Sequence, residues 1–304
     1  MAKRKTAKKK TEIISGLFVL IVALIFIVHS NFSSSETVDT VTHNGSDMVI
    51  TAIDVGQGDS ILITQGEHSV LIDAGTGASE EKLIEYLKNQ NIEKFDYVIA
   101  THPHEDHIGG MDKVVEEFEI DNFIMTELPD DMIPSTKVYE KMVETLLDKN
   151  VNVIAAESGQ SYKAGDINLD ILAPAKLNYD DLNNFSVVTR VSYGETIAIL
   201  TGDAEKDVEE DILRSGENLR CDIYKVGHHG SETSSSEDFL SAMRPTYAVI
   251  SCAEDNSYNH PHTKTIKNLS KYGIKYYVTK DCGAVSFICD GKNVAIHTEK
   301  EISQ

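Results

Sequence analysis

The stretch Thr101-His102-Pro103-His104-Glu105-Asp106-His107-Ile108-Gly109-Gly110 decides the fold of this 304-residue chain. It places three histidines and an aspartate within six positions, directly after an apolar run that ends at Ala100. Neutral imidazole and carboxylate are ligands that suit Zn²⁺ and similar ions. Alternate residues of an extended chain point the same way, so His102 and His104 can share one ion while Asp106 and His107 turn toward a second. The spacing predicts two adjacent divalent metals, Zn²⁺ or Mn²⁺. A surface loop that is merely rich in histidine is disfavoured, because the cluster ends a predicted buried strand.

The first 30 residues carry a targeting signal rather than part of a globular fold. Six basic residues within positions 1–12 precede an uncharged apolar stretch at 13–29. This pattern predicts a basic cytoplasmic tail, a single-pass transmembrane signal anchor and a polar linker at 30–47, with the remaining chain outside the cell. Cleavage near His29 and secretion is the alternative. The anchor is favoured because the apolar run is longer than a usual signal-peptide core and no A-x-A site follows it.

Charge is divided unevenly along the chain. Of its 28 basic and 49 acidic residues, six basic residues and one acidic residue lie in the first 30 positions, leaving 22 basic and 48 acidic residues beyond them. An acidic surface repels phosphate backbones, which counts against a generic electrostatic DNA-binding protein. Bound divalent cations would reverse the sign of the charge locally.

The four cysteines lie in the C-terminal third and form no C-x-x-C pair, so a thiolate zinc knuckle is not expected. They are Cys221, Cys252, Cys282 and Cys289. An extracellular location permits disulfides without requiring them. Buried free thiols and one pairing, such as Cys252 with Cys282, both stay open.

Strand and helix patterns alternate along the remaining chain, which we expect to form one domain at residues 48–300. Short apolar runs broken by glycine-rich turns at 48–55, 61–64 and 70–73 predict an opening antiparallel meander. Ser79 is expected to cap the helix that follows. Further strands are predicted near 95–100, 122–126, 151–155, 167–172, 187–193, 196–200, 222–226 and 247–251, and further helices after Gly110 and near 136–147, 204–213, 236–243 and 263–272. Two strand-rich halves flanked by helices describe a layered αββα sandwich.

The histidine loop resembles the H-x-H-x-D-H signature of the metallo-β-lactamase fold, and further segments follow in the order which that fold requires. Asp73, in 71–75, resembles the aspartate that orients the metal-binding loop from behind the ligands. Asp203, in 200–203, resembles the carboxylate that bridges both metals. His228 and His229, in 225–231, resemble the segment that supplies the last histidine ligand, and either of them can fill that position. The resemblance covers residues 48–298 and implies a four-layer αββα sandwich.

Three segments resemble, more narrowly, the soluble domain of ComEC-type competence proteins, which are membrane proteins of DNA uptake, and its stand-alone relatives. One of these relatives is a phosphorylcholine esterase that acts on cell-surface teichoic acid. The segments are 54–60, the His-His-Gly-Ser run that ends at Ser231, and 256–261. Asp54, Asp59 and Ser231 are expected behind the ligands or beside the substrate, although Asp54 and Asp59 also suit a plain glycine-rich turn. His260 is expected to donate a proton or hold phosphate, or else to cap the next helix.

Most hydrolases of this superfamily supply another histidine ligand from the segment before the bridging aspartate. Here that stretch, 182–188, contains no histidine and resembles the asparagine-containing version of the competence branch. The resemblance makes Asn183 a ligand of the first metal, and an ordinary turn residue is the alternative. Because an amide oxygen is a poorer donor to Zn²⁺ than imidazole, we expect one tightly bound and one labile metal.

The resemblance implies an extracellular metal-dependent hydrolase, a phosphodiesterase or DNase acting through hydroxide held by two metals. Two adjacent cations lower the pKa of a shared water and neutralise charge on the attacked centre. Asp106, Asp203 and His260 are the expected catalytic residues. The alternatives are an esterase acting on a surface polymer or phosphorylcholine, a β-lactamase-type amide hydrolase, and a non-enzymatic metal-binding surface module. The sequence gives no sign of a protein partner.

Overall fold

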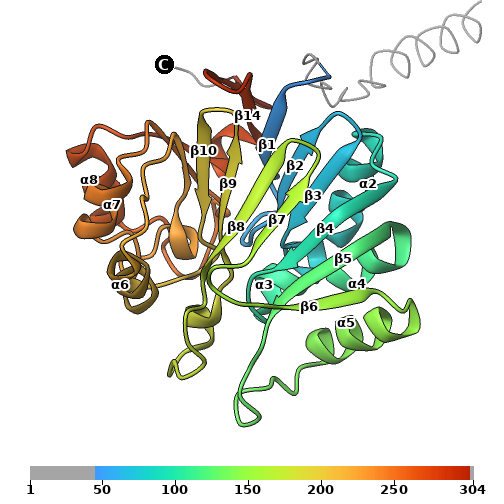
Figure 1. Ribbon diagram of the computed structural model, residues 1–304. Helices are drawn as coiled ribbons and strands as arrows, with labels where there is room; N and C mark the ends of the chain where they lie inside the picture. Colours follow the sequence, from blue (N-terminus) through green and yellow to red (C-terminus); the bar gives the residue numbers. More distant parts are fainter. Residues whose placement is uncertain (1–44, 302–304) are drawn as a thin grey trace, which may run out of the picture. The chain divides into compact units, whose positions relative to one another are not determined.

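Two β-sheets face each other in the computed structural model, which describes residues 45–301, and helices cover both outer faces (Figure 1). The first sheet has eight strands in the order β15-β14-β1-β2-β3-β4-β5-β6, and the second has seven in the order β13-β12-β11-β10-β9-β8-β7. The predicted αββα sandwich is confirmed. The predicted tail, the predicted membrane span and most of the predicted linker lie outside the described residues. Within residues 45–301, no helix has the length and apolarity that crossing a bilayer requires.

Both halves of the chain contribute to the first sheet. Its strands are β1 (Met48–Ala52), β2 (Ile61–Gln65), β3 (His68–Ile72), β4 (Lys94–Ala100), β5 (Glu119–Thr126), β6 (Asn152–Ala156), β14 (Val285–Cys289) and β15 (Val294–Thr298). The strands of the second sheet are β7 (Ser161–Ala164), β8 (Ile167–Ala173), β9 (Val188–Tyr193), β10 (Thr196–Leu200), β11 (Ile223–Lys225), β12 (Tyr247–Ile250) and β13 (Lys275–Val278).

Most of the helices connect strands at the outer faces. The α-helices are α2 (Glu80–Asn89), α3 (Glu105–Ile108), α4 (Met111–Glu117), α5 (Lys137–Asp148), α6 (Lys206–Ser215), α7 (Glu237–Met243), α8 (Thr263–Lys271) and α9 (Thr279–Cys282). Three short 3₁₀ turns are η1 (Gly77–Ser79), η2 (Leu182–Phe185) and η3 (Gly227–Gly230). In Figure 1, α2, α4 and α5 lie on one side of the paired sheets, and α6, α7 and α8 lie on the other.

The core has three layers because both faces of each sheet are covered. Successive strand residues point to opposite faces, so Ile61 and Ile63 of β2 enter the layer between the sheets while Leu62 faces the helices on the first sheet. Leu83 of α2 is fully buried in that helix layer. Phe239 of α7 is its counterpart on the second sheet. Because both faces of each sheet are buried, many strand sequences are nearly continuous apolar runs.

The meander β1-β2-β3 is antiparallel, as predicted. The predicted ranges included no strand for β7, β13, β14 or β15. The last two extend the first sheet from the far end of the sequence, since β14 pairs antiparallel with β1 from Met48 opposite Cys289 to Ala52 opposite Val285. No local sequence signal reveals that two segments so far apart in the chain pair with each other. The four cysteines are buried with free thiols.

One local prediction was only partly right. Ser79 occupies the N-cap position of α2, but its side chain does not cap the helix, because its hydroxyl donates to the carbonyl of Thr76 at 2.8 Å. The strand predicted near 187–193 is β9, which begins at Val188, and the segment before it forms η2. The Asp181 carboxylate accepts from the backbone of Asn183 and stabilises this turn.

Phe287 of β14 tests whether the C-terminal strands complete the core. Its buried ring lies 6.4 Å from the ring of Tyr247 and 6.3 Å from that of Tyr277, both on the second sheet. We expect Phe287→Ala to lower the free energy of unfolding by about 3–5 kcal/mol, because it leaves a cavity between the sheets. Ile288→Ala, on the opposite and partly exposed side of β14, should cost clearly less. Equal losses for the two variants in urea unfolding would contradict this placement.

Candidate metal centre

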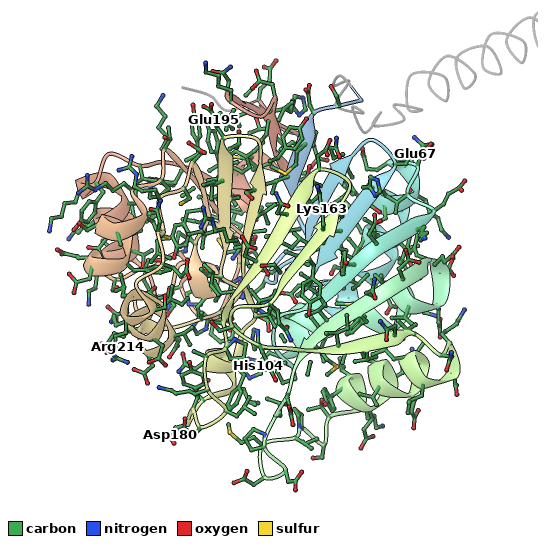
Figure 2. The ribbon with its side chains drawn as sticks, in the orientation of Figure 1. Glu67, His104, Lys163, Asp180, Glu195 and Arg214 are labelled. Atoms are coloured by element: carbon green, nitrogen blue, oxygen red, sulfur yellow. The ribbon has the colours of Figure 1, made fainter. Side chains whose placement is uncertain are left out.

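Residues that directly follow strands of both sheets meet at one place. Asp73 follows β3 and Thr101 follows β4, and these two strands are parallel neighbours. Asp203 follows β10 closely in the second sheet. The backbone of Val187 donates to the carbonyl of Thr101 at 2.9 Å and links the two groups of loops. Figure 2 labels His104, next to α3, near the middle of the molecule. Carboxyl ends of parallel strands are the usual position for a site in such sheets.

Four side chains form the centre of the cluster, with ligand atoms within 4.8 Å of one another: Asp106, His107, Asp203 and His229. The Asp203 carboxylate lies 3.2 Å from Nε2 of His107 and 3.5 Å from Nε2 of His229. His229 Nε2 also lies 3.2 Å from Asp106 Oδ2. Nε2 of both histidines and Oδ1 of Asp203 are buried without a hydrogen-bond partner. These inward-facing imidazole and carboxylate atoms fit a divalent cation.

A second group of imidazoles lies close to Asp203. Nε2 of His102 is 3.0 Å from Nδ1 of His104 and 3.9 Å from Asp203 Oδ2. Asn183 is buried and lines the same cavity as His104, and its Oδ1 has no hydrogen-bond partner. A carboxylate between two ligand groups has the position of a bridging ligand. This free amide oxygen could serve as a neutral ligand of a cation held by His102 and His104.

The two consecutive histidines have different surroundings. His229 belongs to the buried cluster, whereas His228 Nε2 lies 3.8 Å from Asp203 and its Nδ1 lies 3.1 Å from Glu205 Oε1. Both residues have positive φ, 48° and 51°, a strained conformation for residues other than glycine. This backbone turns one ring inward and leaves the other at the cavity wall. The geometry thus selects His229 as the candidate ligand.

Asp73 orients His107 from behind. Its carboxylate accepts from Nδ1 of His107 at 2.7 Å, and from the backbone and hydroxyl of Thr101 at 2.8 and 2.7 Å. Because Asp73 holds Nδ1, Nε2 is the His107 atom that faces the cluster and can bind a cation. Burial raises the pKa of Asp73, against the opposing effect of His107. Sequence reasoning anticipated the position of Asp73 but not the contribution of Thr101.

Asp59 supports His229 in a similar way. Its Oδ1 lies 3.5 Å from Nδ1 of His229, which donates to the carbonyl of Ser251 at 3.0 Å. Its Oδ2 is 2.7 Å from Nζ of Lys225, and both side chains are buried. Burial opposes the charge on Asp59, but Lys225 and His229 hold the pKa of its carboxyl below the ordinary value. Sequence reasoning gave Lys225 no role, although a lysine in an apolar strand was an available signal.

The buried carboxylates stay ionised because positive charge surrounds them. Burial by itself would raise the pKa of Asp203, but His229 and His107 hold it well below its usual range. Their effects also lower the pKa of Asp106 to about 2, despite its partial burial. Burial and the neighbouring His107 hold the pKa of His102 well below the ordinary value. Against the effect of burial, Asp203 raises the pKa of His107 and of His229, so these rings carry the positive charge that the carboxylates need, and divalent cations can supply the same charge.

The cluster opens into a cavity of about 450 Å³. His260 and Tyr258 form part of its wall, together with Gln57, Thr76 and Glu105, for which sequence reasoning assigned no role. Burial, reinforced by His229 and His228, lowers the pKa of His260 to about 4, so its ring is neutral near pH 7. A neutral ring can hold a phosphate through a hydrogen bond but not through charge.

Two expected residues lie outside the cluster. The Asp54 carboxylate accepts from the backbone of Gly56 at 3.2 Å and lies 3.8 Å from Lys82. The hydroxyl of Ser231 lies 2.9 Å from that of Thr233, so Ser231 shapes the loop rather than lining the cavity. The glycine-rich turn that follows Asp54 does contact the cluster. Gly58 packs so closely against the backbone of Asp106 that a Cβ at this position would overlap it.

Comparisons with known proteins agree with this geometry. ComE operon protein 3 of Bacillus subtilis is 28% identical over 94% of this chain and 37% of its own length. Competence protein ComA of Neisseria gonorrhoeae is 30% identical over 80% of this chain and 32% of its own length. The chain thus spans about a third of each curated relative.

A solved structure has the same fold. YhfI of Bacillus subtilis, a metallo-beta-lactamase fold protein, superposes with a TM-score of 0.53 at 14% identity and covers 80% of this chain and all of its own. The family model of the metallo-beta-lactamase superfamily matches residues 53–254. This match spans more than half of the chain and includes every residue of the central cluster. The chain therefore belongs to the metallo-beta-lactamase superfamily.

Proposed function

We propose that this protein is a metal-dependent phosphodiesterase that hydrolyses DNA at the outer face of the cell membrane. The observation that carries the proposal is the position of Asp203 between two groups of imidazoles, next to an open cavity. His102 and His104, with Asn183, would hold one cation. Asp106, His107 and His229 would hold the other, and Asp203 would serve both. Zn²⁺ and Mn²⁺ suit this donor set.

The side chains of the site suit a phosphodiester better than an uncharged substrate. When bound, two divalent cations supply a water of lowered pKa and neutralise charge on the attacked phosphorus. Among the described residues, no lysine or arginine lines the cavity, so the negative charge of the substrate must be met by the cations. Asp73 and Asp59 keep His107 and His229 in one orientation. Neutral His260 can accept a hydrogen bond from the water or the substrate.

DNA is the favoured phosphodiester because the chain resembles ComEC-type competence proteins, which take part in DNA uptake, and competence protein ComA is among its relatives. The same chemistry on a surface polymer or a phosphorylcholine ester is the second candidate, favoured by the acidic chain. Turnover of bis(p-nitrophenyl) phosphate tests the reaction class. Comparison of single-stranded DNA with a choline phosphodiester then separates the two substrates.

Asp203→Ala tests the two-site assignment. Because Asp203 would contact both ions, its loss should abolish phosphodiester turnover and lower bound metal below that of His102→Ala, which should empty chiefly the weaker site. Elemental analysis of the purified, folded variants measures the metal content, and circular dichroism confirms folding. Equal metal content in the two variants would rule out the shared carboxylate.

Asn183→His tests the weaker site. If the Asn183 amide is a ligand, an imidazole at this position should raise retained Zn²⁺ and reduce the dependence of turnover on added Mn²⁺. Asn184→His is the matched control in the same turn, because Asn184 lines no part of the cavity and accepts from the backbone of Glu205. An equal or larger gain in Zn²⁺ for the control would reject Asn183 as a ligand.

The membrane orientation has a separate test. Six basic residues before the apolar stretch at 13–29 favour a cytoplasmic N-terminus and an outward-facing catalytic domain. Protease added to intact cells should therefore remove the domain and leave the first 30 residues protected. Immunoblotting with tags at both ends measures the outcome. Protection of the domain until the cells are lysed would place it in the cytoplasm.

A further inference from the structure

One aromatic side chain at the cavity wall has no role in holding the cluster. Tyr258 is 60% exposed, and it lines the cavity together with His260 and His229. The other exposed large hydrophobic side chains in residues 45–301, such as Leu147 and Tyr276, line no part of this cavity. An exposed ring next to a reaction site is a candidate for substrate contact.

The Tyr258 ring is stacked on that of His260. Their centroids are 5.5 Å apart and their planes differ by 21°. His260 lies in turn 6.0 Å from the ring of His229, so one imidazole separates Tyr258 from the candidate metal ligand. Because His260 covers one side of the Tyr258 ring and most of the residue is exposed, the remaining ring surface is open to a substrate.

Hydrogen bonds hold the backbone of both residues in place. Asn256 fixes His260, accepting from its backbone N–H and donating to its carbonyl, both at 2.8 Å. His262 donates from Nε2 to the carbonyl of Tyr258 at 3.0 Å, and its Nδ1 accepts from the backbone of Glu232. A loop tied at both residues presents a preorganised surface, which reduces the entropy lost on binding.

We propose that Tyr258, backed by His260, is a stacking platform for a nucleobase adjacent to the scissile phosphate of a single-stranded nucleic acid. The inference rests on the proposed phosphodiesterase function and names its substrate class. Stacking accepts every base, because each base has a flat π surface. It also suits an acidic chain, since it needs no electrostatic grip on the backbone.

A quaternary ammonium group fits this wall less well. Choline-like cations are usually enclosed by a cage of several aromatic rings. Among the described residues, Tyr258 is the only tyrosine, phenylalanine or tryptophan that lines the cavity. A single flat ring can stack on a flat base, but it cannot enclose a rounded cation.

The test compares two fluorescent single strands that share one backbone, a natural oligodeoxynucleotide and an abasic oligomer of equal length. The full-length protein should show a lower KM for the natural strand. Tyr258→Ala should raise the KM for the natural strand about 5- to 100-fold, with little change for the abasic strand, so that the preference is lost. Tyr258→Phe should restore the preference, because the ring is retained. Tyr276→Ala, which removes an exposed tyrosine from β13, is the control and should behave as the wild type.

Three other results would overturn the stacking platform. Equal KM values for both strands in the wild type would overturn the platform while leaving the phosphodiesterase function intact. An equal rise for both strands in Tyr258→Ala would assign Tyr258 a structural role and also overturn it. A selective loss of p-nitrophenyl phosphorylcholine turnover in Tyr258→Ala would assign the ring to a quaternary ammonium instead.

Failure of the proposed reaction is distinguishable from failure of the platform. If the wild type cleaves neither strand, the proposal that the protein hydrolyses DNA fails, and fluorescence anisotropy then reports binding alone. Tighter binding of the natural strand, lost in Tyr258→Ala and kept in Tyr258→Phe, would still support stacking. Equal affinity for both strands would reject it.

Discussion

The buried carboxylate of Asp203 is the group on which the arrangement of the site depends. A charge removed from water is stable only when opposite charge and hydrogen bonds compensate it. Here the compensation comes from His107 and His229, which approach from different sheets. The contact therefore joins the loop after β4 to the loops after β10 and β11. Any displacement of one sheet relative to the other would leave charged groups buried without partners.

The surrounding residues make this arrangement rigid. Asp73 and Asp59 each lie behind one histidine, and each is secured by a further buried group, Thr101 or Lys225. Such partners fix the orientation and protonation of an imidazole before a metal arrives. Preorganisation of this kind is what metal-assisted hydrolysis requires, because reactive groups that must reorient add to the barrier.

The cavity wall differs chemically from this charged centre. Its nearby groups are mostly neutral, including His260, Asn183 and the exposed ring of Tyr258. A substrate phosphate would thus be held by cations at the base of the cavity, while the wall contacts the neighbouring parts of the substrate. In the proposed reaction, this division would allow an acidic chain to act on an anionic polymer without a basic surface.

The sequence by itself determined the fold class and identified most of the candidate metal-binding cluster. His102, His104, Asp106 and His107 are adjacent in the chain, and strand periodicity showed that they follow a buried strand. Asp73 and Asp203 were likewise identifiable, because they follow apolar runs in segments typical of the family. The opening meander and most of the helices could be predicted for the same reason, since their signals are local.

Only the tertiary structure decided the features that depend on distant contacts. Selection of His229 over His228 depends on two left-handed backbone conformations, which no residue type in that pair reveals. The different roles of Asp59 and Asp54 depend on Lys225, which pairs with Asp59 and lies far along the chain in β11. The pairing of β14 with β1 and the position of Tyr258 at the cavity also join remote segments. Sequence patterns report local periodicity, whereas these features arise from packing between the two sheets and their loops.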